Sequence, residues 1–160
     1  MTSKKVILTG SFGVGKTSLF NQFIHQNFSD KYLTTIGVKV NKKTLSIKDE
    51  EVSLLIWDIA GEVTQDKVPT SYFLGASGII YVLDLSRPIT FENIDSDIAF
   101  LRKLLPGGVL KVVANKKDLL TAAEIENTIA QIKVPVDVVT SAKTGENVIE
   151  LFKELGEELI

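Results

Sequence analysis

The sequence predicts an α/β fold in which helices cover both faces of a mostly parallel sheet. Short apolar stretches rich in β-branched residues alternate with longer amphipathic stretches along all 160 residues, with no low-complexity linker between them. The runs GIIYVLDL (78–85) and VLKVVANK (109–116) are apolar on both alternate faces, as a strand must be when helices pack on both sides of it. The length suits one globular domain, and we expect residues 1–160 to form it.

Hydrophobic periodicity places the elements along the chain. The strands expected at 38–47 and 52–57 are joined by KDEE, which is too short for a crossover helix, so we expect them to be antiparallel. The prediction is a six-stranded, mostly parallel sheet with one antiparallel strand and about five helices in three α/β/α layers. The predicted strands are Lys5–Thr9, Val38–Ile47, Val52–Trp57, Gly78–Asp84, Val109–Ala114 and Val134–Val139. The predicted helices are Lys16–His25, Asp66–Leu74, Phe91–Leu105, Ala122–Gln131 and Val148–Leu159.

Composition and charge exclude several classes of function. The formal net charge is −2, so there is no basic field to attract nucleic acid, and we expect no nucleic-acid partner. The chain has no cysteine, which excludes disulfides, thiolate catalysis and prenyl or palmitoyl anchors and favours a cytoplasmic location. The apolar stretch after MTSKK is too short for a signal peptide, and Thr2 excludes myristoylation. We therefore expect no direct lipid anchor in this chain, and membrane recruitment only through a partner or a further segment.

Four glycine-rich or polar stretches follow predicted strands. They are GSFGVGKTS (10–18), WDIAG (57–61), VANKKD (113–118) and VVTSAK (138–143). Ligands of open parallel sheets bind beyond the carboxyl ends of the strands. The sequence therefore predicts that these four stretches meet at one rim of the sheet.

The stretch from Gly10 to Thr17 has the spacing of a phosphate-binding loop: glycine, four residues, glycine, lysine and a hydroxyl residue. Its glycines permit backbone conformations in which successive N–H groups point at one anion. Lys16 supplies a charge for the terminal phosphates, and the Thr17 hydroxyl can bind Mg²⁺. The alternative is a structural helix start capped by Thr17 or Ser18. The complete spacing favours a nucleotide site, without saying which nucleotide.

Each of the later stretches is only a weak indication of function when it is taken alone. Asp58 can hold Mg²⁺ through water and Gly61 can bring an N–H close to a phosphate, although Asp before small residues is more often a turn. Asp118 can accept hydrogen bonds from the ring N–H and the exocyclic amine of guanine, a pair that adenine lacks. The N–H of Ala142 can donate to the guanine carbonyl oxygen. Without the preceding phosphate loop, a solvated turn would be the better interpretation of NKKD.

Taken together, GSFGVGKTS, TTIGV, WDIAGE, NKKD and TSAK stand in the order and spacing of the small GTPases, and the sequence resembles the Ras superfamily over essentially its whole length, most closely the Rab branch. The resemblance implies a P-loop GTPase fold and a switch that hydrolyses GTP to GDP and phosphate with Mg²⁺. It also implies effectors and exchange and activating proteins as partners. The metal ligands that it implies are Thr17, Thr35 and Asp58, and the catalytic residues are Lys16, Thr35, Gly61 and Glu62. The residues implied for binding GTP or GDP are Gly10, Gly13, Val14, Gly15, Lys16, Thr17, Ser18, Phe28, Thr35, Asp58, Gly61, Asn115, Lys116, Asp118, Ser141, Ala142 and Lys143.

Two positions depart from the family pattern. Glu62 stands where most Ras and Rab relatives carry the glutamine that orients the attacking water. A carboxylate about 5 Å from one phosphate charge is repelled by roughly 3 kcal/mol at an effective dielectric constant near 20, yet it can also accept a proton from water. Impaired and altered hydrolysis therefore both stay open. Phe12 replaces glycine or a small or polar residue, and we expect its ring to shield the γ-phosphate or to crowd an arriving arginine finger.

The surface expected to bind Rab effectors is also incomplete. Val40 replaces the phenylalanine of the aromatic triad that Rab effectors contact, which leaves Trp57 and Tyr72. Trp57 is either an exposed effector contact or part of the core, and composition favours the core. Two rival functions follow from the sequence. One is a GTP-binding scaffold that hydrolyses negligibly because of Glu62 and Phe12, and the other is an ATP-using P-loop kinase or ATPase.

Overall fold

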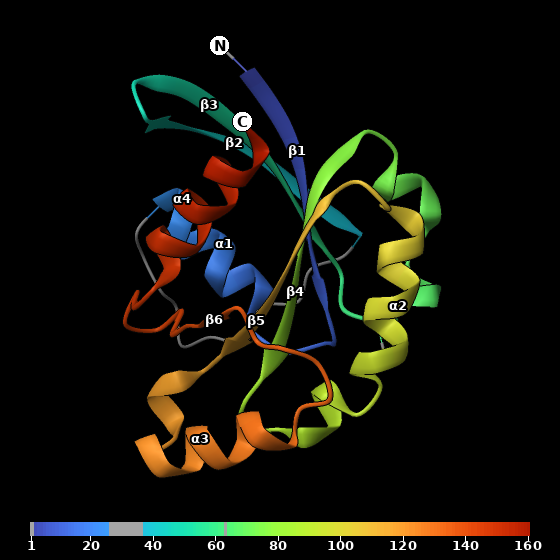
Figure 1. Ribbon diagram of the computed structural model, residues 1–160, viewed down its shortest axis with the longest axis vertical. Coiled ribbons are helices and arrows are strands. Elements are labelled where there is room, and N and C mark those ends of the chain that lie inside the picture. The colour runs from blue at the N-terminus through green and yellow to red at the C-terminus, as the bar shows by residue number, and fades with distance from the viewer. Residues whose placement is uncertain (1, 26–36, 63) are drawn as a thin grey trace.

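The computed structural model describes residues 2–25, 37–62 and 64–160. Six strands and four α-helices alternate along them, joined by loops and short 3₁₀ turns (Figure 1). The strands are β1 (Thr2–Gly10), β2 (Val38–Ile47), β3 (Glu50–Ile59), β4 (Ala76–Asp84), β5 (Val109–Asn115) and β6 (Val138–Val139). The helices are α1 (Lys16–His25), α2 (Ile94–Leu104), α3 (Ala122–Gln131) and α4 (Val148–Leu159). The 3₁₀ turns are η1 (Gln65–Lys67), η2 (Thr70–Phe73), η3 (Pro88–Phe91) and η4 (Lys117–Leu119).

The sheet has the strand order β2-β3-β1-β4-β5-β6, with β2 antiparallel to β3 and every other pair parallel. The predicted fold class and the predicted antiparallel hairpin are thereby confirmed. Since β1 lies between β3 and β4, the loop that follows β1 opens near the middle of the sheet rather than at its edge.

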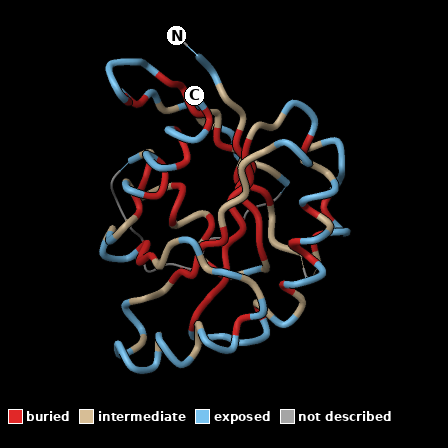
Figure 2. The backbone as a smooth tube through the Cα atoms, in the orientation of Figure 1, coloured by how far each residue is buried: buried red, intermediate tan, exposed pale blue. Residues whose placement is uncertain are grey.

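The core consists of two apolar layers, one on each face of the sheet. Val6 and Leu8 of β1 face α1 and α4, while Ile7 faces the layer that contains α2. Alternate residues of a strand point to opposite faces, so a strand covered on both sides must be apolar at consecutive positions. In the first layer, Phe23 of α1 stacks on Phe152 of α4 with ring centroids 3.8 Å apart. Figure 2 shows the central strands as the buried part of the chain.

The helix predicted at Asp66–Leu74 is wrong, because the structure forms η1 and η2 there instead. Pro69 separates the two turns, and a proline disfavours helical dihedrals in the residue before it. Val68 accordingly has an extended backbone, with φ −75° and ψ 131°. The described residues therefore contain four α-helices rather than about five. Similarly, α2 starts three residues later than predicted, at Ile94 instead of Phe91, after the 3₁₀ turn that begins at Pro88.

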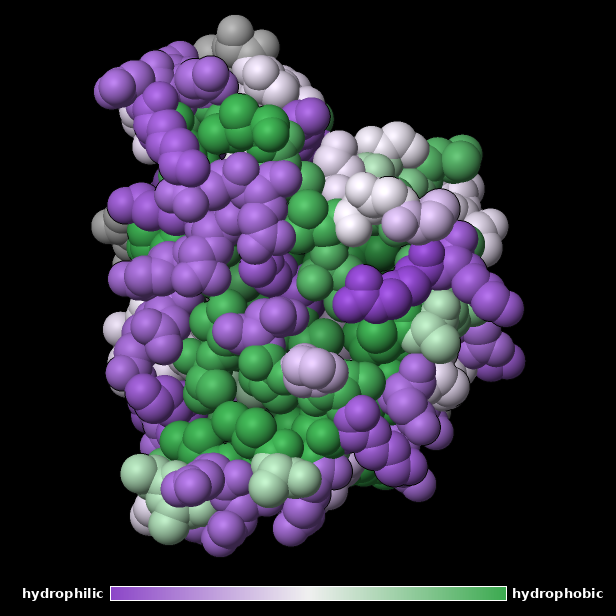
Figure 3. Space-filling model, viewed as in Figure 1, coloured by the Kyte–Doolittle hydropathy of each residue, from purple (hydrophilic) through white to green (hydrophobic). Residues whose placement is uncertain are grey.

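The last helix shows how the sequence divides between core and surface. Leu151, Phe152 and Leu155 of α4 are buried against the sheet, at the spacing of one helical face. On the side of the molecule drawn in Figure 3, hydrophilic side chains gather over α4, and its exposed positions include Glu154 and Glu158. None of the helices among the described residues has both the length and the apolar content needed to cross a membrane.

Candidate functional site

The loop between β1 and α1 has the backbone of an anion cradle. Gly10, Gly13 and Gly15 have φ of 144°, 77° and 101°, in the region that residues other than glycine rarely adopt. A Cβ on Gly10 would lie 2.3 Å from the carbonyl oxygen of Val82 in β4, so the backbone of β4 leaves no room for a side chain at this position. The sequence requirement for glycine thus has two causes here, a backbone conformation and a close approach.

Lys16 places a positive charge at the mouth of this loop. Its side chain is buried, and Nζ donates to the carbonyl oxygens of Gly10 at 3.1 Å and Ser11 at 2.8 Å. Burial lowers the pKa of Lys16 to about 8, while the negative charge of Asp58 opposes that shift. The loop itself therefore holds the Lys16 ammonium group in place. Burial removes water from this group, so a bound anion would stabilise its charged form.

Thr17 and Asp58 meet at the first turn of α1. Thr17 Oγ1 donates to Asp58 Oδ2 at 2.8 Å, and Asp58 lies fully buried near the end of β3. A hydroxyl and a carboxylate oxygen at this distance are the hard donors that Mg²⁺ prefers, and the ion usually keeps several waters and substrate phosphates as its other ligands. These two residues therefore fit a magnesium ion. The third expected ligand, Thr35, lies outside the described residues, as does Phe28.

Gly61 brings the end of the WDIAG stretch against the phosphate loop. A Cβ at this position would lie 2.4 Å from the Cα of Phe12 and 2.5 Å from its backbone nitrogen, so only glycine fits. Glu62 follows directly and is half-buried. The side chain of Phe12 is 48% exposed, so the ring stands at the surface of the loop rather than in the core.

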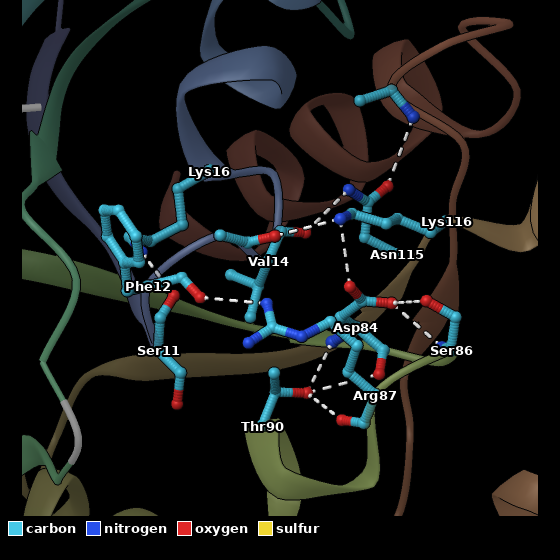
Figure 4. Close-up of polar contacts among 12 residues, drawn as sticks. Ser11, Phe12, Val14, Lys16, Asp84, Ser86, Arg87, Thr90, Asn115 and Lys116 are labelled. Atoms are coloured by element: carbon cyan, nitrogen blue, oxygen red, sulfur yellow. Dashed lines mark hydrogen bonds and ion pairs between the residues drawn. The ribbon is translucent and has the colours of Figure 1, made fainter. Parts of the chain in front are cut away.

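Asn115 joins three loops at the end of β5. Its side chain Nδ2 donates to the carbonyl oxygen of Val14 at 3.0 Å (Figure 4). Its Oδ1 accepts from Thr140 Oγ1 at 3.0 Å and from the N–H of Ala142 at 3.1 Å. Asn115 is buried, and a buried amide with satisfied donors and acceptors fixes the geometry of its partners. The phosphate loop, NKKD and TSAK are therefore one connected structure.

The remaining base-recognition residues sit beside this junction. Asp118 is exposed and its Oδ1 accepts from Ser141 Oγ at 2.8 Å, which leaves carboxylate lone pairs for a ligand. Lys116 adopts a left-handed backbone with φ 68°, donates from Nζ to the Gly13 carbonyl oxygen at 2.9 Å and pairs with Asp84 at 2.9 Å. Lys143 is exposed. The structure thus brings together all four predicted stretches at the carboxyl ends of the strands.

Sequence reasoning missed the loop after β4. Asp84 and Arg87 both reach the phosphate loop region, Asp84 through Lys116 and Arg87 through the carbonyl oxygen of Phe12 at 3.2 Å. The signal was present in LDLSR, which also follows the carboxyl end of a strand, but it contains no recognisable motif.

A buried polar network behind the site was missed as well. Thr9 Oγ1 donates to Gln65 Oε1 at 2.6 Å, the Gln65 N–H donates to Asp97 Oδ1 at 3.0 Å, and Tyr81 OH donates to Asp97 Oδ2 at 3.0 Å. Burial raises the pKa of Asp97, its hydrogen bonds from Gln65 and Tyr81 oppose that shift, and the charges of Asp66 and Asp95 add to it. The network ties η1 to β1, β4 and α2.

Trp57 lies between the two positions expected for it, an exposed effector contact and a core residue. Trp57 is partly buried, with Lys5 Nζ 3.7 Å from its ring centroid and the ring of Tyr72 6.3 Å away. Val40 on the neighbouring strand is 49% exposed. Trp57 is thus neither a fully buried core residue nor a fully exposed one.

Comparisons with known proteins point to one family. A sequence model described as the Ras family matches residues 5–160. The chain belongs to the Ras family. Ras-related protein Rab-13 of Rattus norvegicus is 32% identical over 161 residues, which cover 98% of this chain and 79% of that protein. Ras-related protein Rab-1A of Dictyostelium discoideum is 32% identical over 161 residues, covering 97% and 79%. This Ras-family chain is therefore a small GTPase close to the Rab branch, and the family supports GTP binding with Mg²⁺ and a general GTPase activity.

Proposed function

We propose that this chain is a single GTPase domain that binds GTP, hydrolyses it slowly to GDP and phosphate, and changes the conformation of its switch segments with the nucleotide. The observation that carries the proposal is the junction at Asn115, where one buried side chain joins the phosphate loop to NKKD and TSAK. A phosphate cradle and a guanine-selective carboxylate are useful together only if they are held at a fixed separation, and Asn115 holds them so.

The phosphates would be bound by the N–H groups of the glycine loop and by Lys16. The buried Lys16 ammonium stabilises charge on the terminal phosphates, and the positive end of α1 adds to this. Thr17, Asp58 and Thr35 would hold Mg²⁺, which supplies neutralisation of phosphate charge when it is bound. Gly61, close against Phe12, would donate its N–H to the γ-phosphate.

Guanine would be read by Asp118 and by the N–H of Ala142, with Lys116 and Phe28 covering the ring. Asp118 keeps its carboxylate exposed and oriented through Ser141, which supports this role. Other proposed members of the nucleotide site are Gly10, Gly13, Val14, Gly15, Ser18, Asn115, Ser141 and Lys143.

Switching follows from contacts that exist only with the triphosphate. Thr35 and Gly61 would bind the γ-phosphate, and its loss would release the segments around 30–40 and 61–74. Effectors, exchange proteins and activating proteins would read these segments, and the cysteine-free sequence favours a cytoplasmic site of action.

A scaffold that binds GTP without hydrolysing it is the second candidate, because Glu62 replaces the water-orienting glutamine. Single-turnover assays with GTP and with ATP at high protein concentration separate the possibilities. We expect tight GTP binding and slow GTP hydrolysis, with a faster rate in Glu62→Gln than in Glu62→Ala. Asp118→Asn serves as the base-specificity control and should lose guanine selectivity.

Three outcomes would change the assignment. Equal turnover of ATP and GTP would refute guanine specificity. Tight GTP binding with no detectable hydrolysis would favour the scaffold. Absence of GTP binding would refute the proposed function altogether.

A further inference from the structure

Arg87, in the loop between β4 and η3, contacts the phosphate loop from its outer side. Its Nη1 donates to the carbonyl oxygen of Phe12 at 3.2 Å, from 75 positions further along the chain (Figure 4). Arg87 lies in none of the stretches that carry the family resemblance, whereas Asn115 and Lys116 belong to NKKD. We propose that Arg87 is a positioning residue for nucleotide binding, a cationic brace that orients and polarises the phosphate loop. This inference rests on the function proposed above.

Three side chains hold consecutive carbonyl oxygens of the phosphate loop. The carbonyl oxygens of Phe12, Gly13 and Val14 are consecutive, and each accepts a hydrogen bond from a different side chain. The donors are Arg87, Lys116 and Asn115, at 3.2, 2.9 and 3.0 Å.

The geometry of the peptide unit turns these contacts into an orientation. The described residues contain no cis peptide bond, so in each unit the N–H points away from the C=O. When the Phe12 carbonyl faces Arg87, the N–H of Gly13 faces the opposite side. The same holds for the N–H groups of Val14 and Gly15, and successive N–H groups on one side form the concave anion site of a phosphate loop. Arg87 therefore orients the N–H of Gly13, which is the first of these three N–H groups.

Charge gives the brace a second effect. Behind the loop, the Lys116 ammonium is already paired with the buried carboxylate of Asp84. Among the described residues, Arg87 forms no ion pair with a carboxylate, so it adds a positive charge that this pair does not offset. A cation on the carbonyl polarises the peptide unit and strengthens its N–H as a donor.

The backbone of Arg87 is held firmly enough for this role. The Arg87 N–H donates to the Asp84 carbonyl oxygen at 3.1 Å, and the Arg87 carbonyl oxygen accepts from the Thr90 N–H at 2.9 Å and from Thr90 Oγ1 at 2.8 Å. Pro88 follows and fixes the start of η3. The folded loop thus fixes the backbone from which the exposed side chain of Arg87 reaches the phosphate loop.

The test compares the nucleotide release of four proteins: the parent chain, Arg87→Ala, Arg87→Lys and Arg87→Gln. Arg102→Ala is the matched control, because Arg102 is the other arginine of the sequence and lies exposed in the last turn of α2. We expect Arg87→Ala to release fluorescent GDP about threefold to tenfold faster than the parent. Arg87→Lys should restore most of the difference, Arg87→Gln should restore less, and Arg102→Ala should match the parent.

A readout at the loop separates positioning from mere stability. In the GDP-bound proteins, the amide proton resonance of Gly13 and the ³¹P resonance of the β-phosphate should shift in Arg87→Ala and return toward the parent in Arg87→Lys. The melting temperature should stay close to that of Arg102→Ala.

Each other outcome overturns the proposal. Release at the parent rate from Arg87→Ala refutes the brace while leaving the proposed function intact. Full restoration by Arg87→Gln, or none by Arg87→Lys, refutes the role of the charge. A parent chain that binds no guanine nucleotide refutes both this inference and the proposed function.

Discussion

Replacing Gly15 with alanine tests how the phosphate loop depends on Asn115. Gly15 has φ 101°, and a Cβ there would lie 2.3 Å from Asn115 Nδ2. Alanine must therefore accept a strained backbone and also displace a buried amide that donates to the Val14 carbonyl oxygen. Strain costs about 1–3 kcal/mol, and a broken buried hydrogen bond costs about 1–3 kcal/mol more. We expect Gly15→Ala to lower the free energy of unfolding by about 2–6 kcal/mol in total.

Two other glycines separate these contributions. Gly75 has φ 76° and nothing within 4 Å of an added Cβ, so Gly75→Ala carries the backbone strain alone. Gly107 also has open space and no positive φ, so Gly107→Ala should stay within about 0.5 kcal/mol of the parent. Urea denaturation of the nucleotide-free proteins gives the three values. If Gly15→Ala lowers the free energy of unfolding no more than Gly75→Ala does, the collision with Asn115 costs no free energy. The proposed dependence of the phosphate loop on Asn115 is then wrong.

Three further predictions concern the network, the metal and the loop aromatic. Because burial raises the folded-state pKa of Asp97 above its ordinary 3.8, its stabilising contribution is present below that pH and is lost as the pH rises through the raised value. Urea denaturation from about pH 4 to 7 should therefore show Asp97→Asn gaining stability relative to the parent as the pH rises, and a constant difference would contradict this. Thr17→Ala should weaken Mg²⁺ binding by about tenfold or more, seen as nucleotide release that EDTA no longer accelerates, while Thr17→Ser should behave as the parent. A Ras-type activating protein should stimulate hydrolysis more in Phe12→Gly than in the parent, and equal stimulation would show that crowding by Phe12 is the wrong explanation.

Local sequence patterns predicted most of the fold because the residues that are apolar in the sequence are the ones that fill the two core layers. The alternation of Val6, Ile7 and Leu8 between two covered faces is visible in the sequence and recurs in the two core layers. The hairpin of β2 and β3 follows from a connection too short for a helix. The helix predicted at 66–74 does not form because Pro69 lies inside this stretch and disfavours helical dihedrals in Val68.

The fold class, the phosphate loop from Gly10 to Thr17 and the four stretches that meet at one rim could all be predicted from the residues alone. These properties depend on residue type and spacing within short segments, which a sequence states directly. That Asn115 joins three loops and that Arg87 contacts the Phe12 carbonyl is visible only in the folded chain. Contacts between residues 75 or 101 positions apart depend on how strands order in the sheet and where each loop turns, and no local pattern encodes that distance.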